Sequence, residues 1–368
     1  MGEFNILLLP GDGIGPEVTE SATQVLDSVA AKFGHSFHYE SDLVGGSAID
    51  AYGVPLLDST INTAKKSDAV LFGSVGGPKW DDAEIRPEAA IIGLRKSLGL
   101  FANIRPVRVA PGMEDASPVK NDRVRNTDMI IIRELTGGLY YGKPKRRWTN
   151  KAGRMAVDSM VYSEREVDRI IRVAFELARG RKKKVTSVDK ANVLQVGRMW
   201  REIANEIALD YPDVELEHQL ADSCAMLLVT KPSDFDVLVT SNMFGDILSD
   251  EAAILTASLG MLPSASLAGL PSIGSLGTRK VRGLYEPIHG TAPDIAGSGK
   301  ANPIGEIVSA AFMLRYSFGM ELEAKAIEQS VEGVLAEGLR TADIAGSNES
   351  WVTTSEMTAA IVAGVKSI

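Results

Sequence analysis

The feature that most constrains the fold is an alternation of short apolar stretches, typical of buried strands, with longer amphipathic stretches, typical of helices. Residues 69–73 are apolar throughout, as a strand buried on both faces requires. After Pro16, apolar side chains recur at helical spacing. This alternation indicates an α/β fold with a largely parallel sheet. The sequence predicts strands at 5–10, around Phe37, and at 69–73, 129–133, 185–188 and 235–240, and helices from Pro16 and at 55–66, 88–98, 164–179, 197–209 and 244–259.

The length of the chain predicts about two domains, because 368 residues exceed what one ordinary core supports. Hydrophobic residues make up 45% of the chain and charged residues 24%, which is typical of a folded globular protein. The sequence contains no internal repeat and no low-complexity linker. We therefore expect domains that are joined by continuous strands or helices, with the chain crossing between them more than once.

Charge and cysteine content narrow the possible partners and compartments. A net charge of -9 argues against a nucleic-acid-binding surface, although a local cluster of arginines could still bind a small anion. The single cysteine, Cys224, cannot form an internal disulfide, which favours a reducing compartment. No run of about twenty apolar residues is present, and the N-terminal segment lacks a signal-peptide core. We expect a cytoplasmic protein with no membrane or nucleic-acid partner.

The first glycine-rich segment, GDGIGP at 11–16, follows the first predicted strand. A dinucleotide-binding fingerprint needs glycine or alanine at the position of Pro16, so the pattern fails. Taken alone, the motif indicates a tight strand-to-helix turn. If NAD binds here, it binds in a non-Rossmann manner.

Three arginines stand at the ends or edges of different predicted elements. Arg95 lies in the predicted helix 88–98, Arg105 directly precedes a proline and is therefore extended, and Arg133 ends a strand. Three converging guanidinium groups would bind two carboxylates, because the fork of each one matches a carboxylate in bidentate geometry. The alternative is three separate surface salt bridges.

Two acids, Asp246 and Asp250, are four residues apart at the start of a predicted helix and so share one face. Like charges at this spacing repel unless a cation lies between them, and carboxylate oxygens suit Mg²⁺ or Mn²⁺. Helix capping by Asp246 is the alternative, but it leaves Asp250 unexplained. A third acid, Asp222, follows another strand.

Lys190 follows the predicted strand 185–188. Beside a metal and arginines a lysine has a lowered proton affinity, which suits proton transfer. By itself it would be an ordinary surface lysine.

Together these segments resemble the 3-isopropylmalate dehydrogenase family, which belongs to the β-decarboxylating dehydrogenases together with the isocitrate dehydrogenases. The resemblance covers almost the whole chain, and RELTGG and HGTAPDIAG are its most specific motifs. The segments at 262–266 and 271–282 are nearest to fungal members. The motifs that carry the resemblance are LPGDGIGPEV, GGPKW, RPE, LRKSLGLFANIRP, RELTGGLYYG, SVDKANVL, EHQLADSCAM, SNMFGDILSDEAA and EPIHGTAPDIAGSGKANP.

The resemblance implies two α/β domains around a central cleft, with a cofactor site that is not of the Rossmann type. The first domain would comprise residues 1–104 and 257–368, and the second, residues 105–256, would carry the dimerisation surface and an exposed basic arm at 143–151. It also implies a homodimer in which each active site takes residues from both subunits.

The resemblance further assigns roles to single residues. Tyr140 and Lys190 would be the acid–base pair, with Lys190 coming from the partner. Asp246, Asp250 and a partner Asp222 would bind Mg²⁺ or Mn²⁺, and Asp222 would also lie at the substrate. The other substrate-binding residues would be Glu88, Ile91, Ile92, Arg95, Arg105 and Arg133. The cofactor-binding residues would be Ile14, Glu286, His289, Gly290, Thr291, Ala292, Asp294, Ile295 and Asn302.

The implied reaction is an NAD-dependent oxidative decarboxylation of 3-isopropylmalate, as in leucine biosynthesis. Asp294 favours NAD because its carboxylate would accept hydrogen bonds from both ribose hydroxyls and would repel the 2′-phosphate of NADP.

The chain departs from the family where the substrate's alkyl group is recognised. The usual RPE-x-Gly-Leu-Leu is here RPE followed by Ala-Ala-Ile-Ile at 89–92. Leucine to isoleucine keeps the volume but moves the branch point. One interpretation is drift within a 3-isopropylmalate enzyme. The alternatives are a paralogue that acts on another 3-substituted malate, a non-catalytic regulatory subunit, and a metal enzyme of similar fold without redox chemistry.

Overall fold

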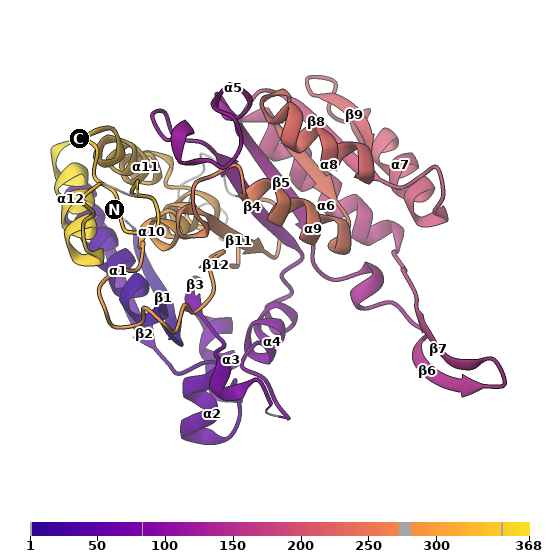
Figure 1. Cartoon of the computed structure of the whole chain (residues 1–368), viewed down its shortest axis with the longest axis horizontal. Helices are drawn as coiled ribbons and strands as arrows, with labels where there is room; N and C mark the ends of the chain where they lie inside the picture. The colour runs from indigo at the N-terminus through magenta and orange to yellow at the C-terminus, as the bar shows by residue number, and fades with distance from the viewer. Residues whose placement is uncertain (1, 83, 272–280, 347–348) are drawn as a thin grey trace.

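The computed structural model describes residues 2–82, 84–271, 281–346 and 349–368. Within these residues a ten-stranded sheet runs through the molecule in the order β2-β1-β3-β12-β11-β4-β5-β10-β8-β9 (Figure 1). A separate two-stranded sheet pairs β6 with β7. The strands are β1 (Glu3–Gly11), β2 (Ser36–Ser41), β3 (Ala69–Ser74), β4 (Ala102–Arg108), β5 (Asp128–Glu134), β6 (Lys145–Asn150), β7 (Gly153–Asp158), β8 (Lys184–Asp189), β9 (Glu215–Leu220), β10 (Val237–Thr240), β11 (Pro263–Leu267) and β12 (Gly283–Pro287).

The helices connect these strands and pack against the sheet. A short π-helical turn, η6 (Met313–Ser317), follows α10, and a 3-10 turn, η5 (Leu259–Met261), precedes β11. The α-helices are α1 (Gly15–Phe33), α2 (Gly46–Tyr52), α3 (Asp58–Lys66), α4 (Ala89–Leu98), α5 (Asn121–Val124), α6 (Glu164–Arg179), α7 (Gln195–Ala208), α8 (Ala221–Thr230), α9 (Asn242–Ala253), α10 (Ile304–Phe312), α11 (Glu321–Ala336) and α12 (Thr354–Ser367).

The central strands read as unbroken apolar runs because both faces of the sheet are covered. In β5, Ile130 and Ile132 join the main hydrophobic cluster, whereas Met129 and Ile131 join a second cluster with α8 and α9. Successive side chains of a strand point to opposite faces, so one strand feeds two cores. Strands that are covered on both faces therefore lack the alternation of polar and apolar residues that is typical of half-buried strands.

The predicted parallel sheet is present in both halves of the molecule, and the centre is antiparallel. β1 pairs in parallel with β2 and β3, and β10 with β5 and β8. Between the halves, β11 is antiparallel to both β12 and β4, and β4 is antiparallel to β5. The predicted domain division between residues 104 and 105 falls inside β4, so the two proposed domains would share one continuous sheet. That division stays a prediction.

Local capping explains why the first and last residues of one helix, α6, could be predicted. α6 spans Glu164–Arg179, as the periodicity indicates, and it begins with a capping box in which Ser163 and Glu166 bond each other's backbone N–H. The helix predicted over 244–259 is shorter: α9 ends at Ala253. The helix predicted from residue 55 begins at Asp58.

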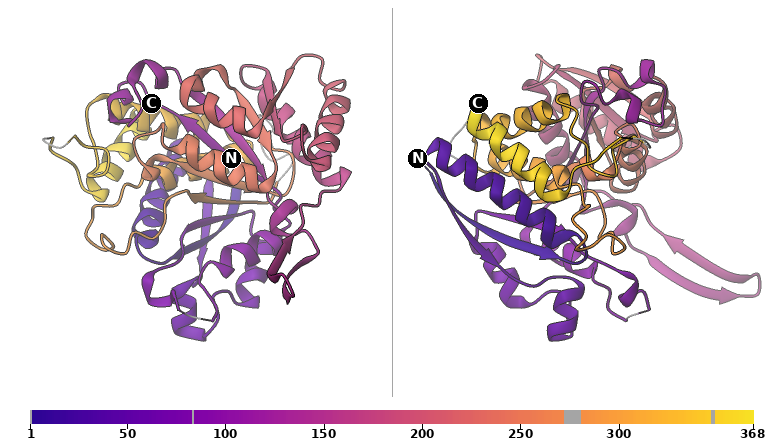
Figure 2. Two further views of the ribbon diagram at one scale, coloured as in Figure 1. Left: turned by 45° about the vertical axis from the view of Figure 1, so that its right-hand side comes forward. Right: turned by 60° about the vertical axis from the view of Figure 1, so that its left-hand side comes forward.

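The basic stretch at 143–151 begins an extended hairpin, formed by β6 and β7, that projects from the body of the molecule (Figures 1 and 2). Every side chain of β6 is exposed, including Trp148, and those of β7 are nearly all exposed. A two-stranded ribbon has no core of its own in one chain. The prediction of an exposed arm is therefore confirmed, with a hairpin as its structure.

The two ends of the chain lie together on one side of the molecule (Figure 1). α1 and α12 pack against each other, and Lys32 Nζ donates to the carbonyl of Val365 at 2.8 Å. Most of the segment at 271–282, on which part of the likeness to fungal members was based, lies outside the described residues. Where the chain is described, no helix combines the length and apolar character needed to cross a membrane.

Candidate active site

The site is built around Arg133, which lies near the carboxyl end of β5 where α9 packs against it. The guanidinium of Arg133 forms an ion pair with Asp246, and its Nε donates to Asn242 Oδ1 at 2.9 Å. Gly245 permits this approach, because a Cβ there would stand 2.7 Å from the Cβ of Arg133. Arg133 is buried, so its charge requires the partner that Asp246 provides.

The other two predicted arginines also meet carboxylates. Arg105, on β4, donates from Nη1 to Asp250 Oδ1 at 2.9 Å and to Ser249 Oγ at 2.7 Å. Arg95, on α4, donates from Nη2 to Glu286 Oε1 at 2.6 Å. Thus Asp246 and Asp250 are each neutralised by an arginine from the sheet, rather than facing one another unpaired.

The three arginines are close enough to influence one another. Burial lowers the pKa of the Arg133 guanidinium below its ordinary value, and the positive charges of Arg105 and Arg95 act in the same direction, against the attraction of Asp246. The structure therefore brings the three predicted arginines into one region, in which the charges of Arg95 and Arg105 act on Arg133. An anion that entered it would relieve their mutual repulsion.

Tyr140 lies in the same cluster. Its hydroxyl donates to Asp246 Oδ2 at 2.7 Å, and the Arg133 guanidinium lies 5.7 Å from the centre of its ring. The hydrogen bond to Asp246, with smaller contributions from burial and from the negative charges of Asp246 and Asp250, raises the pKa of Tyr140 above its ordinary value. Tyr140 therefore carries its proton at neutral pH and can donate it.

Asn242, at the first turn of α9, holds these parts together. Besides accepting from Arg133, its side chain donates to the carbonyls of Leu135 and Gly137 at 3.2 and 3.3 Å. Its backbone N–H donates to the Tyr162 hydroxyl at 2.8 Å. One buried amide thus fixes the helix that carries both acids, the arginine of β5 and the loop that leads to Tyr140.

Lys190 and Asp222 form a separate pair. Lys190 follows β8, Asp222 lies in the first turn of α8, and Lys190 Nζ stands 2.7 Å from Asp222 Oδ1. The hydrogen bond from Lys190 lowers the pKa of the Asp222 carboxyl below its ordinary range. Among the described residues no hydrogen bond or ion pair joins this pair to Tyr140, Asp246 or Asp250.

The two acids of α9 suit a divalent cation in charge and atom type, because carboxylate oxygens are the preferred ligands of Mg²⁺ and Mn²⁺. Both act electrostatically on the same Tyr140 hydroxyl. Within one chain, however, the described part holds no group of three or more His, Cys, Asp or Glu side chains placed to hold a metal. The pair fits a cation that draws further ligands from outside this chain.

The predicted cofactor segments meet at the glycine-rich turn. Gly13 adopts a positive φ of 61°, and a Cβ there would lie 2.0 Å from the carbonyl oxygen of Thr291. Ile14 donates its backbone N–H to that oxygen at 2.8 Å and packs in a small cluster with Ala292 and Ile295. The GDGIGP turn therefore supports the HGTAPDIA segment, although the two lie far apart in sequence.

Two groups in this segment have no polar partner within the described structure. The buried Nε2 of His289 has no hydrogen-bond partner, and burial lowers the pKa of His289. Asp294 is exposed, and no hydrogen bond or ion pair engages its carboxylate in the described structure. Asn302, in contrast, is buried, and its amide contacts Asp343, Met261 and the N–H of Ile304. An orphaned imidazole nitrogen and a free carboxylate fit the hydroxyls and ring nitrogens of an adenosine group.

The predicted alkyl-recognition residues lie on or beside α4. Glu88, Ile92 and Arg95 share one helix face by their spacing, and Ile92 is 51% exposed. Glu88 lies against the loop after β3, since a Cβ on Gly76 would stand 3.2 Å from its Oε1. Ile91 instead packs against a hydrophobic cluster. Of the two isoleucines that depart from the family pattern, Ile92 is the more exposed.

Sequence reasoning missed the residues that hold the site in place. Asp12, within the glycine-rich turn, accepts from the backbone N–H groups of Gly46, Ser47 and Gly76 at 2.7 to 2.9 Å. Asn242 was also missed. The position of Asn242, a polar residue at the start of a predicted helix, was the one hint of its role. Its partners lie on other elements and could not be identified from the sequence.

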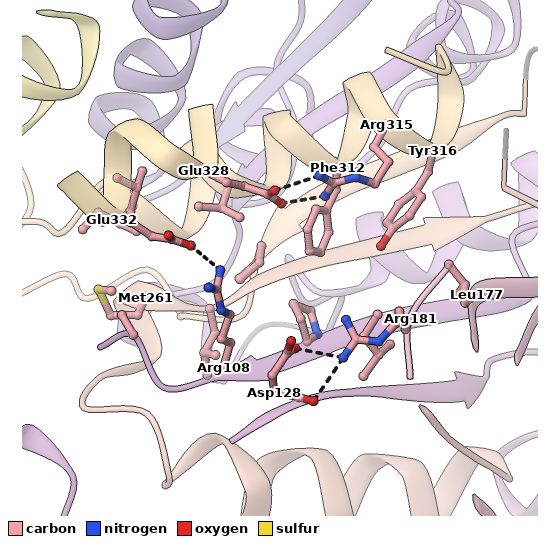
Figure 3. A pocket seen from close by; sticks show the side chains of 18 of the residues that line it. Arg108, Asp128, Leu177, Arg181, Met261, Phe312, Arg315, Tyr316, Glu328 and Glu332 are labelled. Atoms are coloured by element: carbon pink, nitrogen blue, oxygen red, sulfur yellow. Dashed lines mark hydrogen bonds and ion pairs between the residues drawn. The ribbon is translucent and has the colours of Figure 1, made fainter. Parts of the chain in front are cut away.

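A cavity of about 350 Å³ lies elsewhere, between α10, α11, β4 and β5 (Figure 3). None of the predicted site residues lines it. Its arginines are paired: Arg108 with Glu332, Arg315 with Glu328 at 2.6 Å, and Arg181 with Asp128 at 2.8 Å. These pairs leave no free charge to hold an anionic substrate.

A model of the isocitrate/isopropylmalate dehydrogenase family matches residues 5–361. The chain belongs to the isocitrate/isopropylmalate dehydrogenase family. The 3-isopropylmalate dehydrogenase of Dehalococcoides mccartyi is 56% identical over 358 residues, which is 96% of this chain and 97% of the relative. That of Bacillus subtilis is 55% identical and covers 97% of each chain. These two relatives are bacterial, so they leave the likeness to fungal members a prediction.

Solved structures of this family share the whole fold. The isocitrate dehydrogenase from Methylococcus capsulatus superposes with a TM-score of 0.82 at 34% identity and covers 99% of both chains. A β-decarboxylating dehydrogenase from Thermococcus kodakarensis gives a TM-score of 0.80 at 32% identity, over 99% of this chain and 96% of its own. The predicted fold of the isocitrate/isopropylmalate dehydrogenase family is therefore confirmed.

In this dehydrogenase, Asn242→Ala should lower the free energy of unfolding by about 2–4 kcal/mol, because it leaves Arg133 Nε and two loop carbonyls without a partner. Urea denaturation measures the change. Asn62→Ala, at an exposed position of α3, is the control and should change it by no more than about 0.5 kcal/mol. Equal effects of the two substitutions would contradict the role of Asn242.

Proposed function

We propose that this chain is a 3-isopropylmalate dehydrogenase that uses NAD and Mg²⁺ or Mn²⁺ and yields 4-methyl-2-oxopentanoate, CO₂ and NADH in leucine biosynthesis. The observation that carries the proposal is the constellation of Arg95, Arg105, Arg133, Tyr140 and the acids of α9. It offers positive charge for a dicarboxylate, oxygen ligands for a cation and a protonated phenol. Relatives that are 53–56% identical bear the name of this enzyme, which supports the substrate.

The arginines would hold the two carboxylates of the malate. The buried Nε of Arg95 has no hydrogen-bond partner among the described residues. Its N–H can therefore donate to a substrate carboxylate while Nη2 keeps its bond to Glu286. Arg105 and Arg133 are bonded to Asp250 and Asp246. These two carboxylates would bind the metal cation instead when it is present. Their guanidinium groups would then face the substrate with unpaired charge, which favours a dianion.

Mg²⁺ or Mn²⁺, held by Asp246, Asp250 and the partner subunit's Asp222, would acidify the substrate hydroxyl and stabilise negative charge on the neighbouring oxygen. The partner subunit's Lys190 would take the hydroxyl proton as hydride leaves the same carbon. Decarboxylation of the resulting β-keto acid gives an enol. Tyr140, which is protonated at neutral pH, would return a proton to the enol carbon.

NAD would supply the hydride acceptor, bound along Ile14, Glu286 and the segment at 289–295, with Asn302 at its adenosine end. Asp294 supports NAD over NADP, because its free carboxylate would accept from ribose hydroxyls and repel a 2′-phosphate. No basic side chain follows it, since Ile295 and Ala296 come next. The link between Arg95 and Glu286 would connect the substrate end of the site to the cofactor end.

A homodimer would complete each site. Lys190 and Asp222 bond each other, and in the described structure neither bonds Tyr140 or the acids of α9, which supports a model in which each pair serves a different active site. The β6–β7 arm exposes Trp148 and Met155 at the surface, and burial of such side chains in a partner would stabilise a dimer. We further propose that the enzyme works in the cytoplasm, in agreement with its single free cysteine.

The Ala-Ala-Ile-Ile sequence at 89–92 bears on the choice of substrate. The paralogue hypothesis requires an alkyl pocket that differs from that of the relatives, and Ile92 is the exposed candidate for such a difference. The high identity to enzymes named for 3-isopropylmalate favours this substrate. The presence of both acid–base residues and all three proposed metal ligands disfavours a non-catalytic subunit.

The proposal predicts NADH formation when purified protein is mixed with 3-isopropylmalate, NAD and Mg²⁺, and its loss on addition of a chelator. Absorbance at the NADH band measures both. NADP should support a much lower rate than NAD. A folded protein that gives no NADH, or that prefers a bulkier 3-substituted malate, would instead support the paralogue.

Tyr140→Phe should still oxidise the malate but should slow the protonation that follows decarboxylation by about 10²- to 10⁴-fold, because it removes the phenolic proton. NADH formed in the first turnover and the steady-state release of the 2-oxo acid separate the two halves. Tyr141→Phe, at the exposed neighbouring position, is the control. Equal losses in oxidation and in conversion of the isolated keto acid would count against this role of Tyr140.

A further inference from the structure

Glu306, in the first turn of α10, is a carboxylic acid that the proposed reaction does not use. Its side chain is fully buried, and neither carboxylate oxygen has a hydrogen-bond partner in the described structure. The same helix bonds to β12, because Ser309 Oγ donates to the carbonyl of Glu286 at 3.0 Å. Glu306 is therefore an orphaned acid on a helix that packs against the strand of Glu286.

Among the described elements packed against α10, one charged side chain acts on Glu306. The elements packed against α10 are α1, α11, β3, β11, β12, η5 and η6, and β3, β11 and η5 carry no ionisable side chain. Glu286, on β12, is the charge that acts on Glu306. Charged groups of the other packed helices have partners of their own: Glu17, Glu20, Asp27, Lys32, Arg315, Glu321, Glu323, Lys325, Glu328 and Glu332.

An ionised carboxylate in this position would be buried without a compensating partner, which is costly. Burial, with a smaller contribution from the negative charge of Glu286, raises the pKa of the Glu306 carboxyl well above its ordinary value. Burial without a hydrogen-bond donor in the described part of the chain thus favours the protonated, neutral form of the group. Glu286 then remains the carboxylate that pairs with Arg95 in the described structure, at 2.6 Å.

The charge of Glu306 would affect substrate binding through Arg95. In the proposed function it has two tasks, the ion pair with Glu286 and a bond from its unpartnered Nε to a substrate carboxylate. A second negative charge near Glu286 would also attract the guanidinium of Arg95. It would also repel an incoming anion through a poorly solvated interior.

We propose that Glu306 is a positioning residue that, in its protonated form, leaves Arg95 with a single carboxylate partner and so preserves its hold on the anionic substrate. This inference rests on the proposed function. Glu306 does not touch the substrate; it acts through Glu286 and Arg95. Because an anion at Arg95 favours the neutral form of Glu306, substrate binding is linked to retention of the Glu306 proton.

The sign of the pH effect follows from this linkage. As pH rises toward the raised pKa of Glu306, the group ionises and the affinity for the substrate falls. KM for 3-isopropylmalate therefore rises by about tenfold once Glu306 is ionised. The catalytic constant is not affected by Glu306, because no reacting atom contacts it.

Glu306→Gln keeps the shape of the side chain but cannot ionise, so it tests the proposal directly. KM and kcat are measured against pH for the wild-type enzyme, Glu306→Gln and the control Glu20→Gln, which makes the same change at an exposed site of α1. We expect the alkaline rise of KM to disappear in Glu306→Gln alone, with parallel kcat profiles in all three. Superimposable KM profiles in active wild-type and Glu306→Gln enzymes would overturn the proposal.

Stability gives a second readout that needs no activity. In wild type the unfolded chain releases the Glu306 proton above its ordinary pKa while the folded chain keeps it, so stability is lost as pH rises toward the folded pKa. Glu306→Gln should therefore unfold at a higher temperature than wild type at pH 8 and at the same temperature at pH 4. No difference at pH 8 would contradict a neutral buried Glu306. Wild-type enzyme that failed to oxidise 3-isopropylmalate would instead refute the proposed function.

Discussion

The ion pair between Arg133 and Asp246 is the interaction on which the rest of the site depends. Arg133 is buried at the end of a central strand, and removing its partner would leave an uncompensated charge inside the protein. The pair fixes α9 against β5, and Asp246 in turn receives the hydroxyl of Tyr140. Because β4 lies beside β5, the same register brings Arg105 to Asp250 one turn further along α9. Two adjacent central strands thus set the geometry of two arginines, two acids and a tyrosine.

Much of this could be predicted from the chain, because its strongest patterns are local. The capping box and apolar face of α6 define its bounds. The repulsion between Asp246 and Asp250 predicts a positive charge beside them in the form of a metal cation, and that cation stays a prediction. The positive charge comes from Arg105 and Arg133 in this structure, which depends on strand order and could not be read from spacing. The antiparallel β11 was also missed, since PSASL resembles a turn until both neighbouring strands pair with it. Asn242 was missed because its four hydrogen bonds join residues distant in sequence.

Two features of the molecule concern ionisable groups that carry no net charge where they stand. Lys190 and Asp222 neutralise each other and, in the described structure, form no hydrogen bond with Tyr140, which is compatible with the proposal that they act in a second subunit's site. Glu306 is buried without a hydrogen-bond partner among the described residues, burial raises its pKa, and we infer that it keeps its proton while Glu286 pairs with Arg95. In both proposals, a partner subunit or a proton would determine the charge that the substrate meets.

The central claim is that each active site joins Tyr140 and Asp246 of one chain to Lys190 of another. Chains with Lys190→Ala and chains with Asp246→Asn, each inactive alone, can be combined and the mixed dimer purified through two different affinity tags. If sites are shared, the mixed dimer holds one site with both residues intact and regains dehydrogenase activity. If each site is built within one chain, every site carries one lesion, and the mixed dimer remains as inactive as its parents.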